Sequence, residues 1–274
     1  MGSDHVDLAA AARRGVTVAE ATFSNSISVA EHAVMTVLVL VRNFVPAHLT
    51  ALTGGWNVAD LAARSYDLEG FAVGTLGAGR IGLAVLRRLA PFDVQLHYCD
   101  RRRLPGSVER ALNLTYHASP EEMVPLCDVV TINAPLHGET EALFDAKMLA
   151  RMKRGAYLVN TARARICDRD AVVAALETGQ LAGYGGDVWW PQPAPAGHPW
   201  RKAPHNAMTP HISGTSLSAQ ARYAASVHDI LDRFFAGKPI PDEFIIVRDG
   251  KLAGVGAQSY GPRANVADLH GTGS

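Results

Sequence analysis

A glycine-rich loop between a short apolar strand and a helix constrains this chain most strongly. Residues 70–76 are mostly apolar and predict a strand, Gly77-Ala78-Gly79-Arg80-Ile81-Gly82 follows it, and residues 81–89 predict a helix. Asp100 ends the next predicted strand and stands 18 residues after Gly82. Such a glycine pattern is a weak signal alone, but in this context it is typical of dinucleotide binding. The loop therefore predicts an α/β domain that binds a dinucleotide.

Each residue of this pattern has an expected task. Gly77 permits the tight turn, Gly79 lets a pyrophosphate approach the backbone, and Gly82 lets the helix pack closely on the strand. The phosphates are expected at the helix N-terminus, where free N–H groups favour anions. Asp100 is expected to accept hydrogen bonds from the adenosine ribose, which favours NAD over a 2′-phosphorylated cofactor. A glycine-rich turn in an unrelated α/β protein is the alternative.

The rest of the central region alternates short apolar strands with helices. Such alternation indicates βαβ units and a parallel sheet. Ser119 is expected to cap one helix whose first residue is Pro120. The fold predicted is a doubly wound, Rossmann-like α/β domain. Further strands are expected at 94–99, 128–133, 156–160, 182–188 and 207–211, and further helices at 147–153, 168–178 and 218–235.

One predicted helix, residues 28–44, is apolar on most faces. Ser28 and Glu31 have the spacing of a capping box at its start. A helix of this kind needs cover on two sides, from two domains or two subunits. Its apolar stretch is much shorter than the ~20 residues that span a bilayer. Residues 254–274 are rich in Gly and Ser and are expected to be loosely held.

Composition excludes several classes of function. Basic and acidic residues number 26 each, so no net charge favours nucleic acid or an anionic membrane. The three cysteines show no CxxC pairing and the eleven histidines no HExxH spacing, so no metal site is expected. Unpaired cysteines and a start without the pattern of a signal peptide favour a cytoplasmic protein. The run Arg101-Arg102-Arg103 is interpreted as a solvated turn.

Four further segments carry a family resemblance that spans nearly the whole chain. Residues 23–32, 160–163, 186–193 and 209–214 resemble the NAD-dependent formate dehydrogenases of the D-2-hydroxyacid dehydrogenase superfamily. The resemblance implies an NAD-binding domain at 26–213 and remnants of a split, flavodoxin-like substrate domain. These remnants are expected at 1–25 and 214–274, the second including the loose tail.

The resemblance also implies an expectation about activity. Members of the family have a long N-terminal segment that this sequence lacks, and that segment supplies apolar residues over the formate pocket. We therefore expect the chain to bind NAD but to oxidise formate poorly by itself.

The chemistry of formate oxidation suits four residues that the resemblance assigns to catalysis. Arg163 would hold the carboxylate in bidentate fashion, and the amide of Asn25 would hold its other side. His211 would be oriented by Gln192. A 2-hydroxyacid dehydrogenase has a carboxylate at that position, because its histidine must carry a proton. Gln192 is therefore the discriminating residue.

The remaining implied contacts are to the cofactor. Asp187, with Ser213 and Gly214, would meet the nicotinamide amide. A homodimer through residues 28–44 is also implied. The other implied NAD contacts, besides the glycine loop and Asp100, are Ser26, Arg80, Ile81, Pro135, His137, Thr161, His211 and Ser259.

Structural interpretations of the same residues remain open. Arg163 could form an interdomain salt bridge, His211 could be a core histidine, Asn25 could cap a turn, and Asp187 could cap a strand end. Two other functions also remain open. A Glu at position 192 would have favoured a D-2-hydroxyacid dehydrogenase, and a non-catalytic NAD-binding or dimerisation module is the third possibility.

Overall fold

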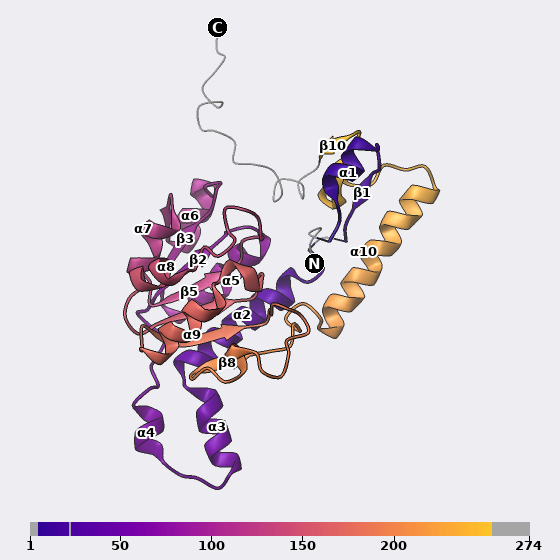
Figure 1. The fold of residues 1–274 in the computed structure, drawn as a ribbon. Helices are drawn as coiled ribbons and strands as arrows, with labels where there is room; N and C mark the ends of the chain where they lie inside the picture. Colours follow the sequence, from indigo (N-terminus) through magenta and orange to yellow (C-terminus); the bar gives the residue numbers. More distant parts are fainter. Residues whose placement is uncertain (1–4, 22, 254–274) are drawn as a thin grey trace. The chain divides into compact units, whose positions relative to one another are not determined.

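Two compact units make up the chain. The computed structural model describes residues 5–21 and 23–253 (Figure 1). One unit comprises residues 25–220, and the other combines residues 1–24 with 221–274. Every candidate site residue except Ser259 belongs to the first unit, and Ser259 lies outside the described residues.

A seven-stranded parallel sheet forms the centre of the larger unit. Its strand order is β4-β3-β2-β5-β6-β7-β8. The chain forms the sheet from β2 outward to β4 at one edge, and then returns to add β5 to β8 on the other side of β2. This reversal of direction defines a doubly wound sheet, and the predicted Rossmann-like fold is confirmed. The strands are β2 (Ala72–Leu76), β3 (Gln95–Cys99), β4 (Leu114–His117), β5 (Val129–Ile132), β6 (Ala156–Asn160), β7 (Leu181–Gly186) and β8 (Asn206–Met208).

Helices cover both faces of this sheet, and each face has its own apolar core. On one face α2 (Ser26–Val41) and α5 (Arg80–Leu89) bury Val37 and Val85 against the strands. On the other face Met148 and Val172 belong to a core with the fully buried Leu158. The helices of this second face are α7 (Pro120–Met123), α8 (Ala146–Arg151) and α9 (Arg169–Glu177). Ser119 accepts a hydrogen bond from Glu122 N, as its predicted capping role requires.

Glycines in β7 bring helix α2 unusually close to the sheet. A Cβ on Gly185 would lie 2.3 Å from Cγ2 of Thr36, and one on Gly183 would lie 3.1 Å from a methyl group of Leu40. Since real Cβ atoms do not approach so closely, only glycine fits at position 185. The close packing of α2 on the sheet therefore depends on two glycines of β7.

The prediction for residues 28–44 is wrong at both ends. Helix α2 begins at Ser26, because Asn25 occupies the N-cap position, and Ser28 instead bonds Ser216 through their hydroxyls at 2.7 Å. The chain leaves the helix at Asn43, which has a left-handed φ of 52°, and α3 (Phe44–Leu52) follows. No single helix of the described residues is long and apolar enough to cross a membrane, although α2 and α3 together, bent by 69°, meet that criterion.

The sequence patterns missed several short elements. In the larger unit these are β4, α3 and α6 (Gly106–Leu112), and α4 (Val58–Ala62) lies between α3 and β2 in the chain. The smaller unit contains α1 (Leu8–Arg13) and an antiparallel sheet of order β1-β9-β10. Its strands are β1 (Val18–Ala19), β9 (Ile245–Arg248) and β10 (Lys251–Leu252), and α10 (Leu217–Phe235) continues into it from the larger unit. The substrate-domain assignment of residues 1–25 and 214–274 stays a prediction.

Candidate active site

The predicted site residues gather at one edge of the parallel sheet. Nearly all of them follow the carboxyl end of a strand, which is where ligands bind in open α/β sheets. Asn25 and Ser26 instead begin α2. Gly77, Gly79, Arg80, Ile81 and Gly82 follow β2, Asp100 follows β3, Pro135 and His137 follow β5, Thr161 and Arg163 follow β6, Asp187 and Gln192 follow β7, and His211, Ser213 and Gly214 follow β8.

The glycine loop has the geometry expected of a phosphate cradle. Gly77 has a left-handed φ of 87°, and a Cβ on Gly82 would lie 1.9 Å from the carbonyl oxygen of Gly77. The turn and the close packing predicted for these two glycines are therefore present. A Cβ on Gly79 would meet no protein atom within 4 Å, so this glycine faces open space at the N-terminus of α5.

Asp100 fastens this loop to the neighbouring strand. Its carboxylate accepts a hydrogen bond from Ala78 N at 2.7 Å and another from Arg102 N at 2.9 Å. A carboxylate offers about four acceptor positions, so two remain for hydroxyl groups of a ligand. Asp100 thus supports the loop structurally, a task that the sequence did not indicate, and keeps acceptors for a ribose.

Asp187 is fully buried and organises the segment that carries the candidate catalytic histidine. Its carboxylate accepts hydrogen bonds from Thr209 Oγ1 at 2.6 Å, Ile212 N at 2.8 Å and Ser213 N at 2.7 Å. The expected alternative, a cap at a strand end, is thus part of its role. Oδ1 receives two of these bonds and Oδ2 one, so one acceptor position is left for an amide N–H donor.

Arg163 lies on a short loop whose shape is set by a buried asparagine. Asn160 ends β6, and its side chain accepts from Ala162 N at 3.0 Å and donates to the carbonyl of Arg163 at 2.9 Å. The guanidinium also donates to the Ala162 carbonyl at 2.8 Å. Bonds on both sides of residue 163 define where its side chain leaves the backbone.

His211 and Gln192 meet as a hydrogen-bonded pair. His211 Nδ1 lies 2.8 Å from Gln192 Oε1, so the ring donates this hydrogen when the amide oxygen accepts. Removal of water from the ring lowers the pKa of His211; Asp187 opposes this effect and the Arg163 guanidinium adds to it. The backbone of His211 is left-handed, with φ of 61°, a strained conformation for a residue with a side chain. The lowered pKa of His211 favours the neutral imidazole near pH 7.

Asn25 does not act as the helix cap that its position would permit. Its side chain makes no capping hydrogen bond, although it occupies the N-cap position of α2. A Cβ on Gly214 would lie 2.5 Å from Asn25 Nδ2, so the amide packs directly on the backbone of Gly214. The glycine makes room for this amide, and the two ends of the 25–214 segment meet at the candidate site.

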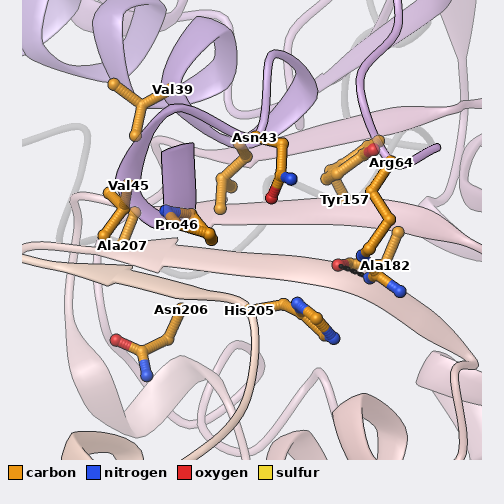
Figure 2. A pocket seen from close by; sticks show the side chains of 11 residues that line it. Val39, Asn43, Val45, Pro46, Arg64, Tyr157, Ala182, His205, Asn206 and Ala207 are labelled. Atoms are coloured by element: carbon orange, nitrogen blue, oxygen red, sulfur yellow. Dashed lines mark hydrogen bonds between the residues drawn. The ribbon is translucent and has the colours of Figure 1, made fainter. Parts of the chain in front are cut away.

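A pocket at the other edge of the sheet is separate from this site. It encloses about 340 Å³ of empty volume, part of it open to solvent, between the end of α2 and the amino ends of β6, β7 and β8. Figure 2 shows Tyr157, Ala182 and Asn206, which come from these strand ends, with Arg64 and His205 beside them. Its remaining lining is mostly apolar.

Several residues that support the site were missed from the sequence. Trp189 donates its indole N–H to the Thr209 carbonyl at 2.8 Å. His32 lies 3.1 Å from Thr209 Oγ1 through its Nε2 atom. Asn160 and Thr209 stand inside the motifs, but nothing in their spacing separates a supporting residue from a ligand-binding one. Burial raises the pKa of Cys127 and Cys167 to about 12, so both thiols stay protonated near neutral pH.

Comparison with known proteins identifies the family. Residues 34–213 match the model of the D-isomer specific 2-hydroxyacid dehydrogenase NAD-binding domain. The chain belongs to this family. The predicted cofactor, NAD, agrees with that description, and the predicted resemblance to formate dehydrogenases is borne out by the individual relatives.

Formate dehydrogenases stand among the similar proteins. The enzyme of Pseudomonas sp. (strain 101) is 65% identical over 260 residues, which are 95% of this chain and 65% of that protein. The solved formate dehydrogenase from Granulicella superposes with a TM-score of 0.91 at 65% identity, covering 93% of this chain and 68% of that one. A Staphylococcus aureus NAD-dependent formate dehydrogenase, solved with NAD, has a TM-score of 0.81 and 48% identity over 90% of this chain and 73% of its own. This chain therefore spans slightly less than two thirds of the Pseudomonas relative's length.

Proposed function

We propose that this protein oxidises formate to carbon dioxide by transferring a hydride to NAD. The observation that carries the proposal is the pairing of His211 with an amide, Gln192, at 2.8 Å. Formate gives up its C–H hydride and leaves as carbon dioxide, so no hydroxyl proton has to be removed. A histidine beside an amide is not driven to become an imidazolium, whereas one beside a carboxylate is. The similarity to named formate dehydrogenases supports the same substrate.

In this proposal two side chains hold formate. Arg163 binds its carboxylate through two charge-assisted hydrogen bonds, which also orient the C–H bond. The amide of Asn25, whose Nδ2 group lies against the backbone of Gly214, donates to a carboxylate oxygen. Neutral His211 contributes an oriented hydrogen-bond partner without adding a second charge. A fixed set of donors stabilises the shift of charge during hydride transfer better than mobile water does.

The residues present fit NAD as the cofactor. Open space beside Gly79, the N-terminus of α5 and the spare acceptors of Asp100 suit a pyrophosphate and an adenosine ribose. The remaining acceptor of Asp187, with Ser213 and Gly214, suits the nicotinamide amide. When bound, NAD supplies the carbon that accepts the hydride. We assign further contacts to Ser26, Arg80, Ile81, Pro135, His137 and Thr161, whose loops lie at the same edge.

We also propose a cytoplasmic location and a homodimer through residues 28–44, with the adjoining helix α3 as part of the contact. Apolar side chains on and around α3 are exposed, among them Phe44, Leu52 and Trp56, the last at 90%. Such a patch on a single chain favours a second copy as its cover.

Three free, buried cysteines suit a reducing compartment.

A substrate panel tests the proposed reaction. The purified protein is incubated with NAD and formate, and reduced nicotinamide is followed by absorbance; pyruvate and glyoxylate are assayed with NADH in parallel. Reduction that depends on formate supports the proposal. Turnover of the 2-oxo acids alone would identify a D-2-hydroxyacid dehydrogenase, and NAD binding without any turnover would identify a binding module.

A further inference from the structure

We infer that His32, on helix α2, is a positioning residue that orients Asp187 and the 209–213 segment through the hydroxyl of Thr209. The inference rests on the proposed function, because Asp187 is the group that would meet the nicotinamide amide. Among the described residues, the hydrogen bond that joins the His32 side chain to the candidate site is this one, from Nε2 to Thr209 Oγ1 at 3.1 Å.

The directions of the hydrogen bonds establish the chain of contacts. Asp187 is a carboxylate and can only accept, so Thr209 must donate its hydroxyl hydrogen to Oδ1 over 2.6 Å. The hydroxyl oxygen is then an acceptor, and His32 Nε2, at 3.1 Å, must carry a hydrogen to donate to it. The bonds therefore run from the imidazole to the hydroxyl and on to the carboxylate. Donation to the hydroxyl strengthens its own donation to the charged Oδ1 atom.

The packing of α2 explains why a helix residue reaches this point. Thr36 is one turn after His32 on the same face of α2, and its methyl group fits against Gly185 where no Cβ could stand. Its hydroxyl donates to the carbonyl of His32 at 2.8 Å, inside the helix. Helix and strand are thus close enough for a direct bond from His32 to Thr209, which follows β8.

The consequence concerns how well the 209–213 segment is held. Trp189 fixes the carbonyl of Thr209, Asp187 fixes the N–H groups of Ile212 and Ser213, and His32 fixes the hydroxyl between them. Burial lowers the pKa of His32, and the Asp187 carboxylate only partly opposes this, so the ring is neutral near pH 7. A neutral ring with its hydrogen on Nε2 still donates. Its Nδ1 atom is then the unprotonated one.

The test compares NAD with ADP-ribose, which lacks the nicotinamide. Their dissociation constants are measured by calorimetry for His32→Phe, which removes the donor, and His32→Gln, which keeps an N–H donor. We expect His32→Phe to weaken NAD binding roughly tenfold, the upper effect of one lost hydrogen bond, and to leave ADP-ribose within twofold. His32→Gln should recover most of the loss. His228→Phe, the same substitution at an exposed histidine of α10, is the matched control and should change neither constant.

Two results would overturn the inference. His32→Phe could weaken both ligands alike, which indicates a general structural defect, or it could leave NAD unchanged while Asp187→Asn weakens it. Failure of the proposed function would be visible separately in the substrate panel, as absent formate-dependent reduction of NAD by the unsubstituted protein. In that case histidine ¹⁵N NMR still decides: the Nε2–H form of His32 is expected, and Thr209→Val should shift its ring resonances, whereas unchanged resonances would contradict the bond.

Discussion

The two edges of the parallel sheet contain similar residue types but hold them differently. At the carboxyl edge Asp187 accepts three hydrogen bonds and Asp100 two, all from neighbouring segments of the same unit. At the amino edge Arg64 donates to the Ala182 carbonyl at 3.2 Å, and the surrounding pocket is mostly apolar. Charge and histidine occur at both edges, so residue type alone does not distinguish them.

The comparison shows that the candidate site is distinguished by how its side chains are held, and not by which residue types it contains. At the carboxyl edge backbone N–H groups donate to Asp100 and Asp187, and the buried Asn160 holds the backbone of Arg163. Groups held in this way need no reorganisation when a ligand binds or reacts. In the amino-edge pocket the side chains of Arg64, Asn43 and Asn206 each donate to a backbone carbonyl, and the described residues that line it include no carboxylate.

The largest expected effect comes from removing the positive charge of Arg163 at the carboxyl edge of the sheet. Arg163→Ala should lower formate-dependent kcat/KM by about 10²- to 10⁴-fold, because two charge-assisted bonds to the substrate are lost. NAD affinity should stay within about threefold. Steady-state kinetics and calorimetry measure the two quantities. Near-normal kcat/KM in the variant would show that the anchor of formate lies elsewhere.

Two glycines of the same loop should respond in opposite ways. Gly82→Ala forces a Cβ against the Gly77 carbonyl, so we expect a loss of about 1–3 kcal/mol in the free energy of unfolding. Gly79→Ala meets no protein atom and should leave the unfolding midpoint unchanged, but NAD affinity should fall about tenfold or more as the phosphates are pushed away. Gly197→Ala, also without neighbours within 4 Å, is the control for both measurements. Unchanged NAD affinity in Gly79→Ala would remove the phosphates from this loop.

The pKa of His211 makes the stability of the fold depend on pH, and a change of its partner Gln192 should reverse the direction of that dependence. In the unsubstituted protein the pKa of His211 lies below its ordinary value, so this histidine costs the folded state stability as pH falls below about 6.5. Gln192→Glu places a carboxylate beside the ring and should raise that pKa. If it rises above the unfolded value, the histidine instead stabilises the folded state at low pH and the contribution is lost as pH rises. Histidine NMR titration of both proteins measures the shift, and equal pKa values would contradict the pairing.

The smallest effect is expected at the amino edge. Arg64→Ala should leave NAD affinity and formate kinetics within twofold, because this side chain borders a pocket at the opposite ends of β6 and β7. It serves as the charge-matched control for Arg163→Ala. A loss beyond tenfold would mean that the two edges are coupled, and the contrast between them would fail.

Sequence patterns predicted the parts of the fold that follow from local chemistry. Gly77 and Gly82 act within a few residues of one loop, and the strands β2, β5 and β6 are short, mostly apolar runs, so the sequence predicts both directly. Strand β4 was missed because it is a short edge strand with polar residues. Asn43 ends α2 by adopting a left-handed backbone, which no residue around it signals.

The candidate site was predictable as a set of residues but not as a network. The family resemblance placed Gln192 beside His211, and the hydrogen bond between them is present. The bonds of Asp187 depend on how the segments after β7 and β8 meet in space. The hydrogen bonds that it accepts from Ile212 N and Ser213 N therefore could not be predicted from the spacing of residues in the sequence. The same holds for His32, which is far from Thr209 in sequence. The start of α2 was misplaced for a related reason, since the Ser28 hydroxyl bonds Ser216, a residue far away in sequence.

Transfer of deuterium from labelled formate tests the central claim most directly. The unsubstituted protein and Arg163→Ala are incubated with NAD and deuterated formate, and the reduced cofactor is examined by mass spectrometry, which detects even slow turnover. Our account predicts one deuterium in each reduced nicotinamide formed by the unsubstituted protein, and little or no labelled product with Arg163→Ala. Absence of labelled cofactor from the unsubstituted protein, or equal labelling by both proteins, would contradict a formate and NAD site at the carboxyl edge of the sheet.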